Sequence, residues 1–225
     1  MDSIDLLKIA ASVLALAVAI IGHEIMHGWV AYRYGDMTAK NAGRLSVNPL
    51  IHVDPIGTIV VPLMMYFIPL ILGMGGGFLF GWAKPVPVNM RTVITNGGYN
   101  AAMQVSLAGI AYNFALAALF AVFLTGMPQP LQSDGLGYVF LYLLVMQLVL
   151  INVILGVFNL LPIPQFDGAH FLMFLSLKMG YYKVAQWFER LEPYGMFIVI
   201  ILLITPLSQY VLFMPVQYVL HLLLS

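Results

Sequence analysis

The chain has 225 residues, of which 62% are hydrophobic and only 8% are charged, with nine basic and nine acidic side chains. A soluble domain carries roughly 25% charged residues, so this composition excludes an ordinary water-soluble domain and predicts a polytopic membrane protein. The zero net charge gives no sign of nucleic-acid binding, and the lack of cysteine excludes disulfides and thiolate metal ligands.

The first apolar segment, residues 6–32, is long enough to cross the ~30 Å hydrocarbon core of a membrane, and it carries the motif HEIMH from His23 to His27. On a helix, histidines four residues apart lie on one face and can bind one zinc ion, with Glu24 placed to take a proton from a water that the metal holds. The alternative is a chance polar patch with a satisfied core histidine. Ionisable groups at membrane depth need a compensating partner, however, and a divalent cation supplies one.

Short extended pieces are expected after this span. "NAGRLSVNPL" (residues 41–50) and "HVDPIGTIVV" (52–61) follow one another closely and look like a β-hairpin. In "GWAKPVPVN" (81–89), Pro85 and Pro87 leave one edge of an extended strand without N–H donors, while Val86 and Val88 keep donors on the other edge. This pattern is typical of an edge strand that cannot pair promiscuously.

Residues 56–80, between these pieces, contain Pro62, Pro69 and the run "GMGGG", and therefore make a poor uninterrupted helix. Non-helical backbone at membrane depth survives only where it is packed in protein or lines a wet cavity. Basic residues follow the apolar segments 6–32, 56–80 and 137–161, whereas the loop 126–135 has none. Because basic loops stay in the cytoplasm, we expect 56–80 to be re-entrant and the N-terminus to lie outside.

Three more apolar segments follow, at residues 101–125, 137–161 and 194–224. The last contains Pro206 and Pro215, so it is either one kinked helix or two shorter ones. The predicted fold class is an all-α polytopic membrane protein with about four to six transmembrane helices, a small membrane-associated β-hairpin and edge-strand region, and a re-entrant segment.

A catalytic zinc usually takes three protein ligands, so the HEIMH motif lacks one. Asp167, in "NLLPIPQFDG" (159–168), follows the inward end of the third strong apolar span, residues 137–161. It lies at the same membrane face as His27 only if 56–80 is re-entrant. Asp134 lies on the opposite face and is excluded. His52, beside a turn-forming Val-Asp-Pro, and His170 remain possible as ligands, and His170 also as a hydrogen-bond partner of a ligand.

The sequence resembles the site-2 protease family, the intramembrane zinc metalloproteases, in its short prokaryotic form without PDZ or CBS domains. The likeness rests on four stretches in the family's order: "HEIMHGWVAYRYGDMTAKNAGRLSVNPLIHVDPIGT", "GWAKPVPVN", "SLAGIAYN" and "NLLPIPQFDG". It implies one Zn²⁺ per chain bound by His23, His27 and Asp167, with Glu24 as general base and Asn159 holding the substrate carbonyl or its oxyanion. An amide near a metal is a suitable donor toward developing negative charge, and an interhelical hydrogen bond is the alternative role of Asn159.

The chain departs from the family's usual pattern at several positions. It has Gly109-Ile110-Ala111-Tyr112-Asn113 for Gly-Pro-x-x-Asn, Pro164-Gln165-Phe166-Asp167-Gly168 for Pro-Pro-Leu-Asp-Gly, His170 for a frequent basic residue and Met90 for a usual proline. None of these changes removes a ligand or the base. We expect them to affect substrate preference and helix packing.

These observations predict a single integral-membrane metalloprotease domain over residues 1–225. It comprises the motif helix at 6–32, the hairpin, re-entrant segment and edge strand at 38–100, core helices ending in the Asp ligand at 101–168, and C-terminal helices at 169–225. The expected reaction is hydrolysis of a peptide bond within or near a transmembrane segment of a membrane-protein substrate. The expected place is a lipid bilayer, the cell membrane, with the site near the cytoplasmic face and no nucleic-acid partner. The sequence predicts no oligomeric state.

A metal-ion transporter and a catalytically inactive relative are the two alternative functions. A metal-ion transporter would spread polar residues along several helices or show inverted repeats, whereas here the polar residues cluster at one depth. A catalytically inactive relative that only binds membrane proteins would often lack the base, and Glu24 is present.

Overall fold

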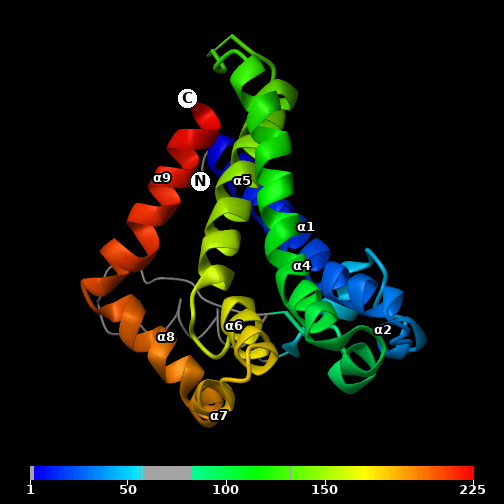
Figure 1. The fold of residues 1–225 in the computed structure, drawn as a ribbon. Helices are drawn as coiled ribbons and strands as arrows, with labels where there is room; N and C mark the ends of the chain where they lie inside the picture. The colour runs from blue at the N-terminus through cyan, green and yellow to red at the C-terminus, as the bar shows by residue number, and fades with distance from the viewer. Residues whose placement is uncertain (1–2, 56, 58–82, 132) are drawn as a thin grey trace.

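The structure is a computed structural model that describes residues 3–55, 57, 83–131 and 133–225 (Figure 1). The long helices are α1 (Ser3–Arg33), α4 (Met90–Gly126) and α5 (Leu136–Leu160). The shorter helices are α2 (Thr38–Asn41), α6 (Asp167–Lys178), α7 (Tyr182–Leu191), α8 (Gly195–Ile204) and α9 (Met214–Leu224). Two 3-10 helices, η1 (Pro49–His52) and η3 (Glu192–Tyr194), and a π-helix, η4 (Gln209–Phe213), complete the helical elements of the described part.

Three helices, α1, α4 and α5, are long and apolar enough to cross a membrane. The stretches Tyr182–Ile204 and Gln209–Leu224 form a pair bent by 94°, which makes a fourth candidate span among the described residues if the pair counts as one. Within that part of the chain, the protein is therefore an all-helical membrane protein.

Rows of buried residues at a spacing of four hold the three long helices together. The row on α1 consists of Ala11, Ala15, Ala19 and His23. The row on α4 consists of Ala101, Val105, Gly109, Asn113, Ala117 and Ala121. Small residues let helix backbones approach closely in a membrane, and rows at this spacing form ridges that pack into the grooves of a neighbouring helix. The helices α1, α4 and α5 accordingly pack against one another in pairs.

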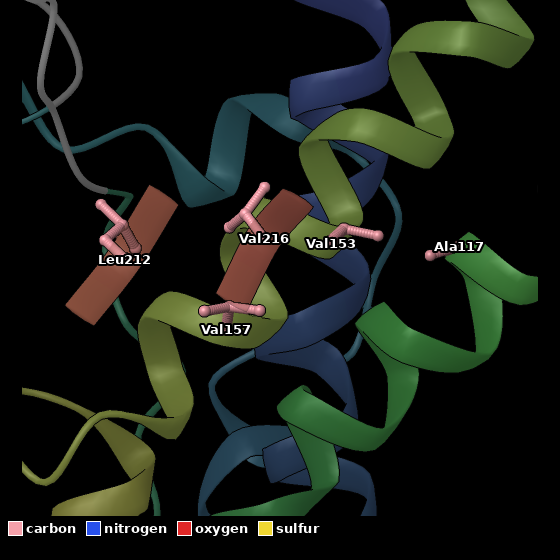
Figure 2. Packing of buried hydrophobic residues seen from close by; sticks show 5 residues of the cluster. All are labelled: Ala117, Val153, Val157, Leu212 and Val216. Carbon is pink, nitrogen blue, oxygen red and sulfur yellow. The ribbon is translucent and has the colours of Figure 1, made fainter. Parts of the chain in front are cut away.

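The C-terminal elements pack onto the outer side of this bundle. Figure 2 shows the cluster that joins them: Ala117 from α4, Val153 and Val157 from α5, Leu212 from η4 and Val216 from α9. Pro206 lies at the break between the two halves of the bent pair, where it interrupts the last apolar segment. The predicted segment 194–224 is therefore two helices.

The predicted β-hairpin is wrong, because the described residues contain no β-strand. Its first half, residues 41–50, includes the end of α2 and the start of η1. Most of its second half and nearly all of the predicted re-entrant segment, 56–80, lie outside the described residues. The candidate spans found in the described part are three or four, against the four to six expected.

The predicted edge strand at residues 81–89, of which the structure describes residues 83–89, is also wrong. This segment has no helical structure and joins no β-ladder with the described residues. Pro85 and Pro87 lack N–H groups. Of the other N–H groups, that of Val86 donates to the Glu24 carboxylate, that of Asn89 to the Asp36 carboxylate, and that of Lys84 to the His52 backbone oxygen. Two carboxylates and one backbone oxygen of a 3-10 helix thus accept the hydrogen bonds that a neighbouring strand would accept.

Candidate metal centre

The side chains of His23, His27 and Asp167 converge at one point. His23 and His27 lie one turn apart on α1, in line with its row of small residues, and Asp167 is the first residue of α6. The Asp167 Oδ2 atom lies 3.1 Å from His23 Nε2 and 3.2 Å from His27 Nε2, and the two Nε2 atoms are 3.1 Å apart. Among the described residues, this is the one group of His, Asp or Glu side chains with the spacing of a metal site.

The outer nitrogens of both histidines are held by α4. The Nδ1 atom of His27 lies 2.7 Å from the backbone oxygen of Val105, and that of His23 lies 2.7 Å from Oδ1 of Asn113. A carbonyl oxygen can only accept a hydrogen bond, so each histidine carries its proton on Nδ1. In its neutral form each histidine then presents the lone pair of Nε2, and both Nε2 atoms face Asp167.

This arrangement fits a zinc ion. Three buried or half-buried acceptor atoms face one another, and the Asp167 Oδ2 atom has no hydrogen-bond donor in the described structure. Such atoms repel one another unless a proton or a metal cation lies between them, and a metal cation can satisfy all three at once. Tetrahedral zinc with bonds of ~2.0–2.1 Å separates its ligand atoms by roughly 3.3 Å, close to the observed triangle, and three nitrogen or oxygen ligands leave a fourth position open.

Two glycines allow the close approach of these side chains. A Cβ atom at Gly109 on α4 would overlap the imidazole of His23. A Cβ atom at Gly168 would overlap the backbone oxygen of Leu160, so glycine lets α6 begin directly against the end of α5. Any larger residue at either position would push a proposed ligand out of the triangle.

Glu24 does not belong to the triangle. Its Oε2 atom accepts a 2.8 Å hydrogen bond from the Val86 backbone N–H, in the segment 83–89. The same segment is held at its ends, where Arg44 donates to the Lys84 oxygen at 2.6 Å and the Asn89 N–H donates to Asp36 Oδ2 at 2.6 Å. Polar side chains from α1 and the residues that follow it therefore place this segment next to the motif.

The other candidates lie apart from the triangle. Asn159 donates from Nδ2 to the Leu155 oxygen on its own helix, at 3.0 Å, so its contact with a substrate stays a prediction. His52 bonds through Nε2 to the Ser46 oxygen, and His170 lines a small pocket with Phe188 and other residues of α6 and α7. Neither histidine is part of the metal-like group found in the described residues.

Two asparagines extend from the site into the bundle: Asn113 contacts His23, and Asn152 contacts Asn113. Asn113 was noted only as part of a motif, and Asn152 lies unremarked in the third strong span. Both are fully buried. An amide in the middle of an apolar span is itself a signal, because polar groups at membrane depth are expensive unless they are paired.

The chain is similar to proteins named as zinc metalloproteases. A family model described as "Peptidase family M50" matches residues 136–204, a range that includes Asn159 and Asp167. The chain is 36% identical over 204 residues to "Putative zinc metalloprotease YwhC" of Bacillus subtilis (strain 168), covering 89% of this chain and 83% of that protein. It is 31% identical over 190 residues to "Putative zinc metalloprotease Rip2" of Mycolicibacterium smegmatis, covering 82% of this chain and 62% of that protein. No solved structure gives a significant match.

Proposed function

The chain is a site-2-protease-like member of peptidase family M50, and we propose on this basis that it is a zinc-dependent endopeptidase that cleaves a peptide bond within or near a transmembrane segment of a membrane protein. The observation that carries the proposal is the triangle of His23 Nε2, His27 Nε2 and Asp167 Oδ2 at 3.1–3.2 Å. Its convergence at one point of the bundle favours a fixed catalytic site over a transport path with sites along several helices.

The proposed zinc would be held, one ion per chain, by His23, His27 and Asp167. Such an ion supplies Lewis acidity, which lowers the pKa of a bound water and polarises a carbonyl oxygen. The hydrogen bonds from α4 keep both Nε2 lone pairs aimed at it. Glu24, the neighbour of His23 on α1, is the group assigned to proton transfer.

The chemistry assigned to the protein's own residues is acid–base catalysis. Glu24 takes a proton from the attacking water, whose oxygen adds to the carbonyl carbon of the substrate. When the C–N bond breaks, Glu24 gives that proton to the leaving amine, and the products are a carboxylic acid and an amine, which ionise to a carboxylate and an ammonium group. Asn159 is proposed to donate its amide N–H to the negative charge on the carbonyl oxygen, which requires it to leave its bond to Leu155.

We propose that the site faces the cytoplasm of a cell in whose membrane the chain is embedded. In Figure 1, α2, α6 and α7 lie at one end of the bundle and the loop between α4 and α5 lies at the other. The first end carries basic residues, among them Lys40, Lys178 and Lys183, whereas the loop carries none. Basic loops stay in the cytoplasm, so this distribution supports a cytoplasmic site.

The test is zinc content and cleavage in one preparation. We expect near-equimolar zinc in the purified chain, its loss in Asp167→Ala and its retention in His52→Ala. Glu24→Gln should keep zinc and lose cleavage of a single-span substrate in detergent or vesicles. Zinc that is unaffected by Asp167→Ala, or cleavage that survives Glu24→Gln, would overturn the proposal.

A further inference from the structure

We propose that Asn113 on α4 is a positioning residue for His23, and that its amide, held in place by Asn152 on α5, sets the zinc affinity of the site. This inference rests on the proposed function, because it presupposes that His23 binds the metal. Both amides are 0% exposed and lie where α1, α4 and α5 meet.

The hydrogen bonds run in one direction through the three helices. Asn152 donates from Nδ2 to the Leu148 oxygen at 2.7 Å, so its Oδ1 is the accepting end. That Oδ1 accepts from Asn113 Nδ2 at 2.9 Å, and Asn113 Nδ2 also donates to the Ala19 oxygen at 3.2 Å. The Asn113 Oδ1 atom is left to accept from His23 Nδ1 at 2.7 Å.

Neither side-chain amide can exchange the positions of its oxygen and nitrogen without losing hydrogen bonds. If Asn152 were flipped, its oxygen would face the Leu148 oxygen and its nitrogen would face the nitrogen of Asn113. If Asn113 were flipped, its oxygen would face the oxygens of Ala19 and Asn152. The orientation of Asn113 is therefore determined by its neighbours, and it presents a fixed acceptor to His23.

The place of Asn113 in its row indicates that more than helix packing is involved. The other buried members of the row on α4 are Ala, Val and Gly residues, which have no polar side-chain atoms. The amide occurs at the level of His23 Nδ1. A metal-binding histidine that donates its other ring N–H to a fixed acceptor keeps one tautomer and one ring orientation, and loss of such an acceptor typically weakens metal binding about 10- to 100-fold.

His27 provides the contrast within the same site. Its Nδ1 atom bonds to the backbone oxygen of Val105, which side-chain substitutions at that position retain. Changes at Asn113 therefore act on one of the two histidines, and the effect on zinc can be assigned to His23.

The experiment compares zinc affinity by chelator competition in purified wild type, Asn113→Leu and Asn113→Asp, with the absorption spectrum of the cobalt-substituted proteins as a second readout. Asn113→Asp keeps an oxygen that can accept from His23 Nδ1, whereas Asn113→Leu keeps the size and loses the acceptor. We expect Asn113→Leu to weaken zinc binding about 10- to 100-fold and to change the cobalt spectrum, and Asn113→Asp, which keeps the acceptor, to bind zinc about tenfold more tightly than Asn113→Leu.

A purely structural role would give a different result. Both variants lose the bonds from Asn113 Nδ2, so both would then lower the melting temperature of the metal-free protein and leave the zinc affinity and the cobalt spectrum unchanged. Wild-type zinc affinity in Asn113→Leu, or equal losses in both variants, would overturn the inference. If Asn113→Leu does not fold, Asn113→Ala provides the same comparison. A wild-type chain that binds no zinc would overturn the proposed function itself, which separates the two failures.

Discussion

The backbone N–H of Val86 donates a 2.8 Å hydrogen bond to Oε2 of Glu24, although 62 residues separate the two in sequence. The segment 83–89 thus contacts the proposed base directly. Gly28, one turn beyond Glu24 on α1, allows this contact, because a Cβ atom there would lie 2.7 Å from Cγ1 of Val86.

Replacing Val86 with proline should reduce cleavage and leave zinc content unchanged. Proline has no N–H, so the carboxylate of Glu24 loses the donor that orients it, while His23 and Asp167 keep their positions. Because a well-placed acid–base group contributes 10²–10⁴-fold to a rate, we expect a loss of about tenfold or more in kcat. Val86→Ile keeps the N–H and serves as the control; equal activity of the two variants would contradict this role of the Val86 amide.

Gly109→Ala should lower zinc affinity. The added methyl group overlaps the ring of His23, so the imidazole or α4 has to shift. Gly126→Ala is the matched control on the same helix, since a Cβ atom there has no neighbour within 4 Å among the described residues. We expect chelator competition to show at least tenfold weaker zinc binding in Gly109→Ala and no change in Gly126→Ala. Equal affinities would mean that the ring of His23 does not depend on the glycine.

Removing the metal should lower the melting temperature. Zinc present at 1,000 times its dissociation constant stabilises the folded chain by about 4 kcal/mol, which corresponds to roughly 10 °C for a chain of this size. Treatment with a chelator should produce this decrease in the wild type, and added zinc should reverse it. Asp167→Ala should melt at the same temperature with or without chelator, and a decrease of equal size in this variant would contradict the ligand assignment.

Asp36 should stabilise the protein more at neutral than at acidic pH. Burial raises its pKa, but hydrogen bonds from Thr38 and from the Asn89 N–H outweigh this effect and hold the pKa below its ordinary value. A lowered carboxyl pKa contributes stability above the unfolded value of ~3.9, and this stability is lost as the pH falls through the folded pKa. We expect Asp36→Asn to cost about 2 kcal/mol at pH 7 and progressively less below about pH 4, as measured by thermal melting. An equal cost at both pH values would contradict a charged Asp36.

The sequence was a good guide where chemistry depends on local spacing. A spacing of four positions from His23 to His27 puts both on one face of a helix, and the structure has them there. Asp167 was favoured by an argument about topology, and the structure brings it to both histidines, although the segment on which that argument depended lies outside the described residues. The roles of these residues in metal binding stay predictions.

The sequence was a poor guide where a partner is distant along the chain. The prolines of the segment 83–89 indicate extended backbone, but local sequence does not say whether its N–H groups meet a strand or a carboxylate. Glu24 and Asp36 supply the partners, 62 and 53 residues away. For the same reason the pairing of Asn113 with Asn152 and His23 was not predicted.

The spacing of four along α1 also bears on how the helices find their alignment during assembly. Because Ala11, Ala15 and Ala19 recur at every fourth position on α1, sliding α1 by one turn would leave alanine at most positions of this part of the row. The slipped arrangement would instead put Ala19 or His27 where His23 meets Asn113, and would break the contact of His27 with Val105. The two histidines thereby distinguish the native alignment of α1 from alignments shifted by one helical turn. The residues assigned to bind metal thus also help to fix the register of α1 against α4.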